Sequence, residues 1–174
     1  MNHNLIAFTG FGRAGKDEAA KVLITAGYER CSLGNIIKAQ LDPLVRRHFG
    51  FSAFTEDTGQ KARIRRTLES WGEDNYEELQ RSFFDSLPPK AVNTRLCRLR
   101  EAQDWVSRGG IIVEVRRPGI EAETSWVEEQ MADLHQHKMI HSVVSNEGTI
   151  PELHAKIRGL FRLEEPQFTA ASLN

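Results

Sequence analysis

A glycine-rich segment close to the start of the chain has the residue types and spacing of a phosphate-binding loop. Residues 10–16, GFGRAGK, match the pattern G-x-x-x-x-G-K. Glycines in this pattern let backbone N–H groups point inward at phosphate oxygens, and the lysine ammonium reaches the β- and γ-phosphates of a nucleotide. The segment therefore predicts an ATP-binding loop whose contact residues are Gly10, Gly12, Arg13, Ala14, Gly15 and Lys16.

The residues on either side of this segment are those that such a loop requires. Leu5 to Thr9 form a short apolar run that stops at Gly10, which predicts a buried strand. Residues 17–26 carry apolar side chains at helical spacing, so a helix N-terminus would add its partial positive charge to the site. The simpler interpretation, a strand-to-helix turn that binds nothing, also fits the glycines.

Asp17 stands where a phosphate loop usually has Ser or Thr, whose hydroxyl ligates Mg²⁺. A carboxylate can hold Mg²⁺ directly or through water, because hard cations prefer oxygen ligands. An acidic side chain in the first turn of a helix is also favourable without a metal. The sequence leaves both roles open for Asp17, which counts among the candidate ATP and metal contacts.

Residues 10–17, GFGRAGKD, resemble the phosphate loop of bacteriophage-type deoxynucleoside monophosphate kinases. That family has the wider P-loop nucleoside monophosphate kinase fold, together with dephospho-coenzyme A kinase and one type of phosphomevalonate kinase. The matching segments follow the family's order and cover most of residues 4–162. Four further segments are similar to the same family: SLGNIIK at 32–38, RRTLESWG at 65–72, IIVEVRRP at 111–118 and NEGT at 146–149.

The resemblance implies a fold and a reaction. The fold is α/β, a three-layer P-loop kinase fold with a mainly parallel sheet, helices on both faces and a helical acceptor-binding insertion. The alternation of short apolar runs with helical segments independently favours a parallel sheet with right-handed crossovers. The implied reaction is phosphorylation of a deoxynucleoside monophosphate to the diphosphate, with ATP as phosphoryl donor and Mg²⁺ as cofactor.

Two alternatives to that reaction stay open. One is a P-loop kinase of another small phosphorylated acceptor, such as dephospho-coenzyme A or phosphomevalonate. The other is a nucleotide-binding switch without turnover. The arginine-rich segment between residues 33 and 108 favours a kinase with an acceptor site over a switch, because the arginine guanidinium is suited to gripping phosphate.

A single domain is expected over residues 1–163, followed by a loose tail at 164–174. Its core comprises 1–32 and 109–163, and the region of about 33–108 is helical and holds the acceptor and the lid. The apolar patterns predict strands at 5–9, 28–32, 111–115 and 139–144 and helices at 17–26, 33–48, 60–71, 74–84, 91–107, 120–134 and 150–162.

Four side chains are candidates for catalysis: Lys16, Arg13, Arg116 and Glu114. Phosphoryl transfer needs positioning and charge neutralisation, so Arg13 would span the donor and acceptor phosphates. Glu114 interrupts an apolar strand near its carboxyl end, the end that faces the ligand crevice in open α/β sheets. It would hold Mg²⁺ through water or, alternatively, pair with Arg116. Arg116, with Arg117 beside it, is assigned to a lid that excludes water.

The resemblance also implies residues for the acceptor and for the adenine of ATP. Lys38 and Arg65 would hold the acceptor monophosphate, Arg65 through two parallel hydrogen bonds. Arg63 and Arg66 lie on the same polar helix face and are further candidates, although solvated side chains would explain most of this set. Asn146 follows the last predicted strand and would hydrogen-bond the adenine, unless it is an ordinary turn asparagine.

The histidines and tryptophans, which could bind a metal or a ligand, have simpler explanations. Three histidines are spaced poorly for a metal and are expected to be solvated: His135, His137 and His141. Three tryptophans lie on apolar helical faces and are expected in the core: Trp71, Trp105 and Trp126.

The overall composition limits the class of partner. The formal net charge is −1, which argues against a dedicated nucleic-acid binder. Cys31 and Cys97 are too isolated for a disulfide framework, which favours a reducing cytoplasm. The sequence shows neither a signal peptide nor an apolar run long enough to span a membrane. The expected partners are small-molecule nucleotides, and a homodimer is left open.

Overall fold

The computed structural model describes residues 4–163, so the predicted tail at 164–174 lies outside the described residues. The chain is divided into two compact units. The first, the sheet unit, comprises the described residues up to 30 and those from 89 onward. The second, the helical unit, comprises residues 31–88.

A five-stranded sheet forms the centre of the sheet unit, with the strand order β2-β3-β1-β4-β5. Strand β1 pairs in parallel with β3 and with β4, and β4 pairs in parallel with β5. The predicted parallel sheet is therefore confirmed. The strands are β1 (Leu5–Thr9), β2 (Glu29–Cys31), β3 (Ala91–Asn93), β4 (Ile111–Arg116) and β5 (Ser142–Ser145).

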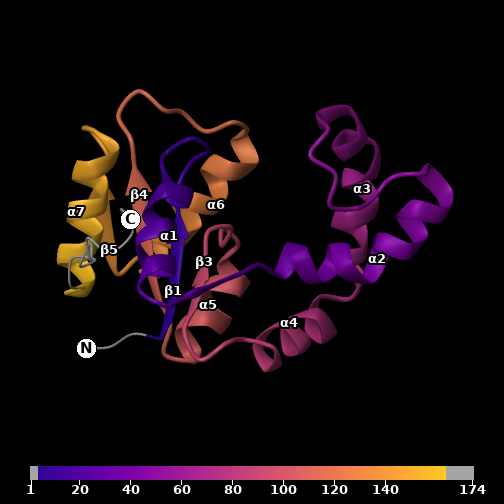
Figure 1. Cartoon of the computed structure of the whole chain (residues 1–174), viewed down its shortest axis with the longest axis horizontal. Coiled ribbons are helices and arrows are strands. Elements are labelled where there is room, and N and C mark those ends of the chain that lie inside the picture. Colours follow the sequence, from indigo (N-terminus) through magenta and orange to yellow (C-terminus); the bar gives the residue numbers. More distant parts are fainter. Residues whose placement is uncertain (1–3, 164–174) are drawn as a thin grey trace, which may run out of the picture. The chain divides into compact units, whose positions relative to one another are not determined.

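Helices cover both faces of this sheet, as predicted (Figure 1). Helices α1 (Lys16–Thr25) and α7 (Ile150–Phe161) pack together on one face, and α5 (Leu99–Ser107) and α6 (Ser125–Gln136) pack on the other. Alternate residues of β1 serve the two layers, because successive side chains of a strand point to opposite faces. Ile6 and Phe8 join the core under α1 and α7, whereas Thr9 donates a hydrogen bond to Met131 Sδ of α6 at 3.3 Å.

Strand β3 corrects the prediction of a helix over residues 91–107. Ala91, Val92 and Asn93 are buried beside β1, and α5 begins only at Leu99. A three-residue strand is too short to show an alternating pattern, and the apolar spacing of the following helix extends across it. The segment of about 33–108 thus contributes one strand and one helix to the sheet unit.

The helical unit contains α2 (Leu33–Phe49), α3 (Thr58–Asp74) and α4 (Tyr76–Asp85). Pro43 lies inside α2 without ending it. A small apolar cluster joins α2 to α3 and the segment between them: Leu41, Val45, Ala53 and Ile64. Asp57 caps α3, because its carboxylate accepts a hydrogen bond of 2.7 Å from the backbone N–H of Gln60.

Two further predictions need correction. Helix α6 begins at Ser125 rather than at 120, because Thr124 caps it and the preceding residues form a loop. Of the three tryptophans, only Trp105 is in the core, at 1 % exposed, whereas Trp71 and Trp126 are 39 % and 43 % exposed. Among the described residues, no helix is long and apolar enough to cross a membrane.

Candidate nucleotide site

The predicted phosphate loop lies between β1 and α1, at the carboxyl edge of the sheet. Two of its glycines have backbone angles that other residues rarely adopt, with φ of +125° at Gly10 and +106° at Gly15. A Cβ atom at Gly10 would collide with the carbonyl oxygen of Val115, and one at Gly15 would lie 2.6 Å from Asn146 Nδ2. The loop therefore needs glycine at both positions for space as well as for conformation.

Lys16 folds back onto the loop that precedes it. Its ammonium donates hydrogen bonds to the carbonyl oxygens of Gly10 and Phe11, each at 2.7 Å. Burial lowers the pKa of Lys16, and the nearby carboxylates of Glu123 and Asp17 partly oppose that shift. Because its two hydrogen-bond acceptors are neutral, the ammonium would gain from an anion bound in the loop.

Asn146 fastens the loop to the end of β5. Its side-chain amide donates a buried hydrogen bond of 2.8 Å to the carbonyl of Ala14, and its backbone N–H donates to Arg116 O at 2.7 Å. The residue is only 9 % exposed. Asn146 thus holds the loop to the sheet, while its predicted contact with adenine stays a prediction.

Replacing Asn146 by Asp is expected to lower the free energy of unfolding by about 1–3 kcal/mol, because a carboxylate cannot donate to the Ala14 carbonyl. Urea unfolding measures the change. Asn75→Asp is the matched control, since the Asn75 amide donates an exposed hydrogen bond to Trp71 O at 3.0 Å that water can replace. Equal losses in the two variants would contradict a buried structural role for Asn146.

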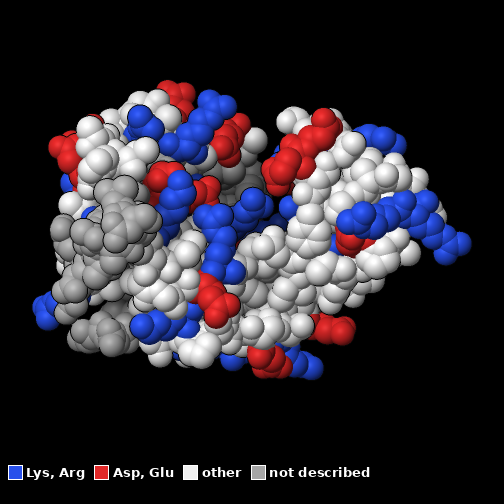
Figure 2. All heavy atoms as spheres, viewed as in Figure 1, with Lys and Arg blue, Asp and Glu red and all other residues white. Residues whose placement is uncertain are grey.

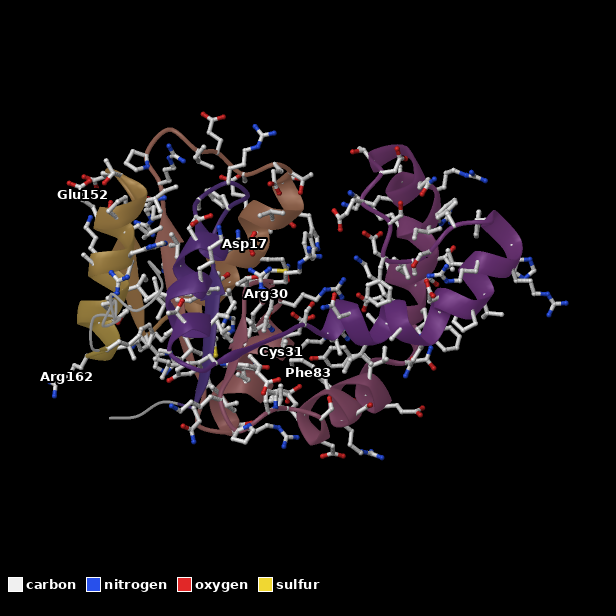
Figure 3. All side chains as sticks on the ribbon, viewed as in Figure 1. Asp17, Arg30, Cys31, Phe83, Glu152 and Arg162 are labelled. Atoms are coloured by element: carbon white, nitrogen blue, oxygen red, sulfur yellow. The ribbon has the colours of Figure 1, made fainter. Side chains whose placement is uncertain are left out.

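Asp17, at the start of α1, lies between two partners from neighbouring strands. Its Oδ1 accepts hydrogen bonds from Arg30 of β2 at 2.5 Å and from the hydroxyl of Thr94, just after β3, at 3.1 Å. Figure 3 shows Asp17 and Arg30 next to each other. The side chain of Asp17 is 73 % exposed, so its other oxygen is accessible to an additional ligand.

Glu114 is buried at the end of β4, with both carboxylate oxygens engaged. Arg116 donates from Nε at 3.1 Å and from Nη2 at 2.9 Å, and His135 Nε2 of α6 lies 2.8 Å from Oε2. The pairing with Arg116 is the alternative that the sequence left open for Glu114. His135, expected to be solvated, instead faces this carboxylate because α6 covers that side of the sheet.

A cavity of about 250 Å³ lies beside the loop. Phe11 and Ala14 line it from the loop, and the end of β4 with the following residues, 114–120, lines the rest. Arg116 and Arg117 therefore border a space next to the phosphate loop, where the sequence predicts a lid. Arg13, inside the loop, is exposed and has a φ of +62°.

Two residues near the loop are not predicted as site residues by the sequence. Arg95 lies close enough to Lys16 to lower its pKa further, beyond the main effect of burial. It follows β3, so recognising that strand would have placed Arg95 at the carboxyl edge with the loop. Glu123 lies against Gly12, in the segment that the sequence assigned to the beginning of a helix.

The predicted acceptor residues all lie in the helical unit. Lys38 lies over the ring of Phe54 at 5.7 Å, and Arg63 lies over the rings of Phe49 and Phe51 at 5.4 Å from each. The side chains of Arg65 and Arg66 are exposed and, within residues 4–163, form no hydrogen bond or ion pair. Arg63 thus has a packing role, whereas Arg65 and Arg66 present unengaged guanidinium groups.

Charges of both signs are spread over the face of the sheet unit that Figure 2 shows. Basic and acidic side chains are interspersed there, in keeping with the nearly balanced composition of 23 Lys and Arg against 24 Asp and Glu. The positive potential expected at the loop is therefore local, from Lys16, Arg13 and the backbone N–H groups.

The central parallel sheet, its strand order and the loop between β1 and α1 define a P-loop kinase-like α/β fold. No protein-family model and no curated protein sequence matches the chain. Similar solved structures include a dephospho-CoA kinase from Campylobacter jejuni, at 11% identity over 92% of this chain and 96% of that chain, with a TM-score of 0.50.

Two further solved structures show the same likeness. A shikimate kinase from Acinetobacter baumannii, in complex with shikimate, has 16% identity over 92% of this chain and 93% of that chain, with a TM-score of 0.50. The protein TT1252 from Thermus thermophilus has 19% identity over 95% of this chain and 100% of that chain, with a TM-score of 0.52. At these identities the likeness shows the fold, and the reaction has to be argued from the residues of the site.

Proposed function

We propose that this protein transfers the γ-phosphoryl group of ATP to a deoxynucleoside monophosphate, giving the diphosphate and ADP. The observation that carries the proposal is the loop between β1 and α1, in which the Lys16 ammonium is held on neutral carbonyl oxygens and Gly10 and Gly15 have positive φ angles. A loop of this kind at a helix N-terminus is suited to bind a triphosphate.

Lys16 and the loop N–H groups bind the donor phosphates. On binding, the ammonium exchanges its two carbonyl contacts for phosphate oxygens, and its charge then lies where negative charge develops on the leaving group. Arg13 is exposed on the same loop, where its guanidinium neutralises charge on the transferring phosphoryl group. Asn146 keeps the loop in place through Ala14 during this exchange.

Arg116 acts at the transferring phosphoryl group from the end of β4. Glu114 fixes the guanidinium through two hydrogen bonds, and His135 fixes Glu114 in turn. The Arg116 side chain is 59 % exposed, so part of it faces outward beside the cavity that borders the loop. A guanidinium held in this way loses little freedom when it binds phosphate.

Magnesium fits this site through Asp17 better than through Glu114. Both oxygens of Glu114 already accept hydrogen bonds, whereas only Oδ1 of Asp17 does so among the described residues. Within residues 4–163 there is no cluster of three His, Cys, Asp or Glu side chains that could hold a metal ion. One protein carboxylate together with substrate phosphates is nevertheless a common set of Mg²⁺ ligands. When bound, the ion would neutralise phosphate charge.

The acceptor monophosphate is assigned to the helical unit, where Arg65 and Arg66 of α3 and Lys38 of α2 offer positive charge. The choice of a deoxynucleoside monophosphate rests on the similarity of residues 32–38 and 65–72 to the bacteriophage-type kinases. Unengaged arginines suit a phosphate dianion, which they can bind through two parallel hydrogen bonds.

Replacing Arg65 by Ala is expected to raise the KM for the acceptor about 10- to 100-fold with little change in the KM for ATP, because a charged hydrogen bond contributes about 1.5–3 kcal/mol. Steady-state kinetics with each substrate varied in turn measures both values. Arg63→Ala is the comparison on the same helix, and its stacking on Phe49 and Phe51 predicts lower stability with a smaller effect on KM. Equal rises in both KM values for Arg65→Ala would place Arg65 outside the acceptor site.

The proposal is tested by ADP release with ATP, Mg²⁺ and a panel of acceptors. Stimulation by one or more deoxynucleoside monophosphates is expected. Stimulation by dephospho-coenzyme A, phosphomevalonate or shikimate alone would assign the chain to another acceptor. Tight ATP binding without stimulation by any of these acceptors would favour a nucleotide-binding switch.

A further inference from the structure

Glu123 lies directly over the phosphate loop. A Cβ atom built on Gly12 would collide with Glu123 Oε1, so the carboxylate already fills the space next to this glycine. Glu123 also contributes the largest favourable charge interaction that Lys16 receives. A negatively charged group from another part of the chain therefore lies at the loop that we assign to the phosphates of ATP.

Helix α6 fixes the position of Glu123. Two contacts hold α6 to the carboxyl edge of the sheet: Met131 Sδ accepts from Thr9 of β1, and His135 Nε2 faces Glu114 of β4 at 2.8 Å. Thr124 then caps the helix, with its hydroxyl accepting from Val127 N at 3.3 Å. Because Glu123 immediately precedes the cap, the anchored helix presents it to the loop.

The Glu123 carboxylate has no other partner among the described residues. Among residues 4–163, no side chain or backbone group forms a hydrogen bond or ion pair with Glu123, and the residue is exposed. The Lys16 ammonium is near enough for a favourable charge interaction with this carboxylate. Attraction to that ammonium favours this position over the loop, and a charge interaction without a hydrogen bond is easily exchanged for a stronger one.

We propose that Glu123 is an internal competitor for the phosphate site, which lies over the loop when no nucleotide is bound and is displaced by the phosphates of ATP. The role rests on the proposed function only in that the loop binds nucleotide phosphates. In the bound state the carboxylate would repel the triphosphate if it stayed in place, so every binding event includes its displacement. Glu123 thereby weakens the affinity for nucleotides.

Glu123 lies in a connecting segment outside the sheet and outside α6, so its side chain can leave the loop without unfolding either element. Residues 117–124 join β4 to α6, and one hydrogen bond of 3.3 Å, from Ile120 N to Arg117 O, closes a turn within it. Gly119, in this turn, has a φ of +74°, and a Cβ atom there would meet nothing within 4 Å. Displacing Glu123 therefore disturbs neither the sheet nor the two contacts that hold α6.

The charge-neutral variant Glu123→Gln tests the proposal by calorimetric binding of ATP, inorganic tripolyphosphate and adenosine, each without and with Mg²⁺. We expect the Kd for ATP and for tripolyphosphate to fall about tenfold, the effect of removing one partly screened like charge. Adenosine, which has no charge, should bind equally to both proteins. Glu121→Gln is the matched control, because Glu121 is an exposed acid of the same loop, whereas the atoms nearest to a Cβ atom at Gly12 all belong to Glu123.

Three results would overturn the proposal. An unchanged Kd for tripolyphosphate in Glu123→Gln would show that the carboxylate does not compete. A Kd that rises only with Mg²⁺ present would make Glu123 a metal contact instead. An equal fall of the Kd in Glu121→Gln would show that the effect comes from the net charge of the protein and not from the position of Glu123.

The competitor role of Glu123 and the proposed kinase reaction can be refuted separately. If ATP binds the protein and the Lys16→Met variant loses that binding, while Glu123→Gln binds as the parent does, then only the competitor is refuted. If Glu123→Gln tightens ATP binding but no acceptor stimulates ADP release, then the competitor is supported and the transfer to a nucleotide is refuted. Absence of ATP and tripolyphosphate binding in all variants contradicts both.

Discussion

Replacing Lys16 by Met is expected to lower kcat about 10²- to 10³-fold while the protein remains folded. Methionine keeps an unbranched side chain of similar length and removes only the ammonium. The lost charge interacts more strongly with the transition state than with bound ATP, because negative charge moves toward the leaving oxygen during transfer. The two hydrogen bonds to Gly10 O and Phe11 O are also lost, so a thermal melt accompanies the kinetics.

Lys21→Met provides the matched control on the same helix. Lys21 is 63% exposed and pairs with Glu18 at 2.6 Å, one turn beyond the site. Its replacement is expected to change kcat less than about twofold, since exposed ion pairs contribute little. A well-folded Lys16→Met variant with near-parental turnover would contradict the phosphoryl-transfer mechanism, and Lys16 would then be an ordinary first-turn lysine.

Replacing Gly10 by Ala is expected to abolish measurable ATP binding at millimolar concentration and to destabilise the fold. At a φ of +125°, any Cβ atom strains the backbone, and such strain costs about 1–3 kcal/mol. At this position the Cβ atom also collides with the carbonyl oxygen of Val115. Since β4 is central to the sheet, the loop rather than the strand must shift, and its N–H groups no longer converge on one anion.

Gly27→Ala separates the two effects. Gly27 has a positive φ of +86°, and nothing lies within 4 Å of a Cβ atom there. This variant should therefore show the backbone strain alone, with urea unfolding reporting a loss of about 1–3 kcal/mol and ATP binding preserved. Similar ATP affinities for Gly10→Ala and Gly27→Ala would show that the close approach to Val115 is not needed for binding.

The sequence predicts the sheet unit well where patterns are long and local. Residues 5–9 are a short apolar run and residues 111–115 are apolar apart from Glu114, and both segments are inner strands of the sheet. It fails at β3, because three residues cannot show a period and the strand is stabilised by its neighbours, through pairs such as Leu5 with Ala91. The exposure of Trp126 was not predicted for a related reason. Apolar spacing shows which residues share a helix face but not where the helix begins, and Trp126 lies in the first turn of α6.

The candidate site was predictable where it is contiguous in the chain. The glycine spacing of residues 10–16 predicts the loop, and in the structure Gly10 and Gly15 have the positive φ angles that only glycine tolerates well. Arg95 and Glu123 are brought to Lys16 by the packing of the sheet unit, from segments about 80 to 110 residues away in the chain. No local pattern marks either residue, since each depends on a tertiary contact of its neighbouring element.

The most direct test of the central claim follows the phosphoryl group itself. ATP labelled in its γ-phosphate is incubated with the protein, Mg²⁺ and each deoxynucleoside monophosphate, and the products are separated by chromatography. We expect label to appear in a deoxynucleoside diphosphate with the parent protein, and at least about 100-fold more slowly with Lys16→Met. Label that stays in ATP, or passes only to water, with every nucleotide tested would contradict a deoxynucleoside monophosphate kinase.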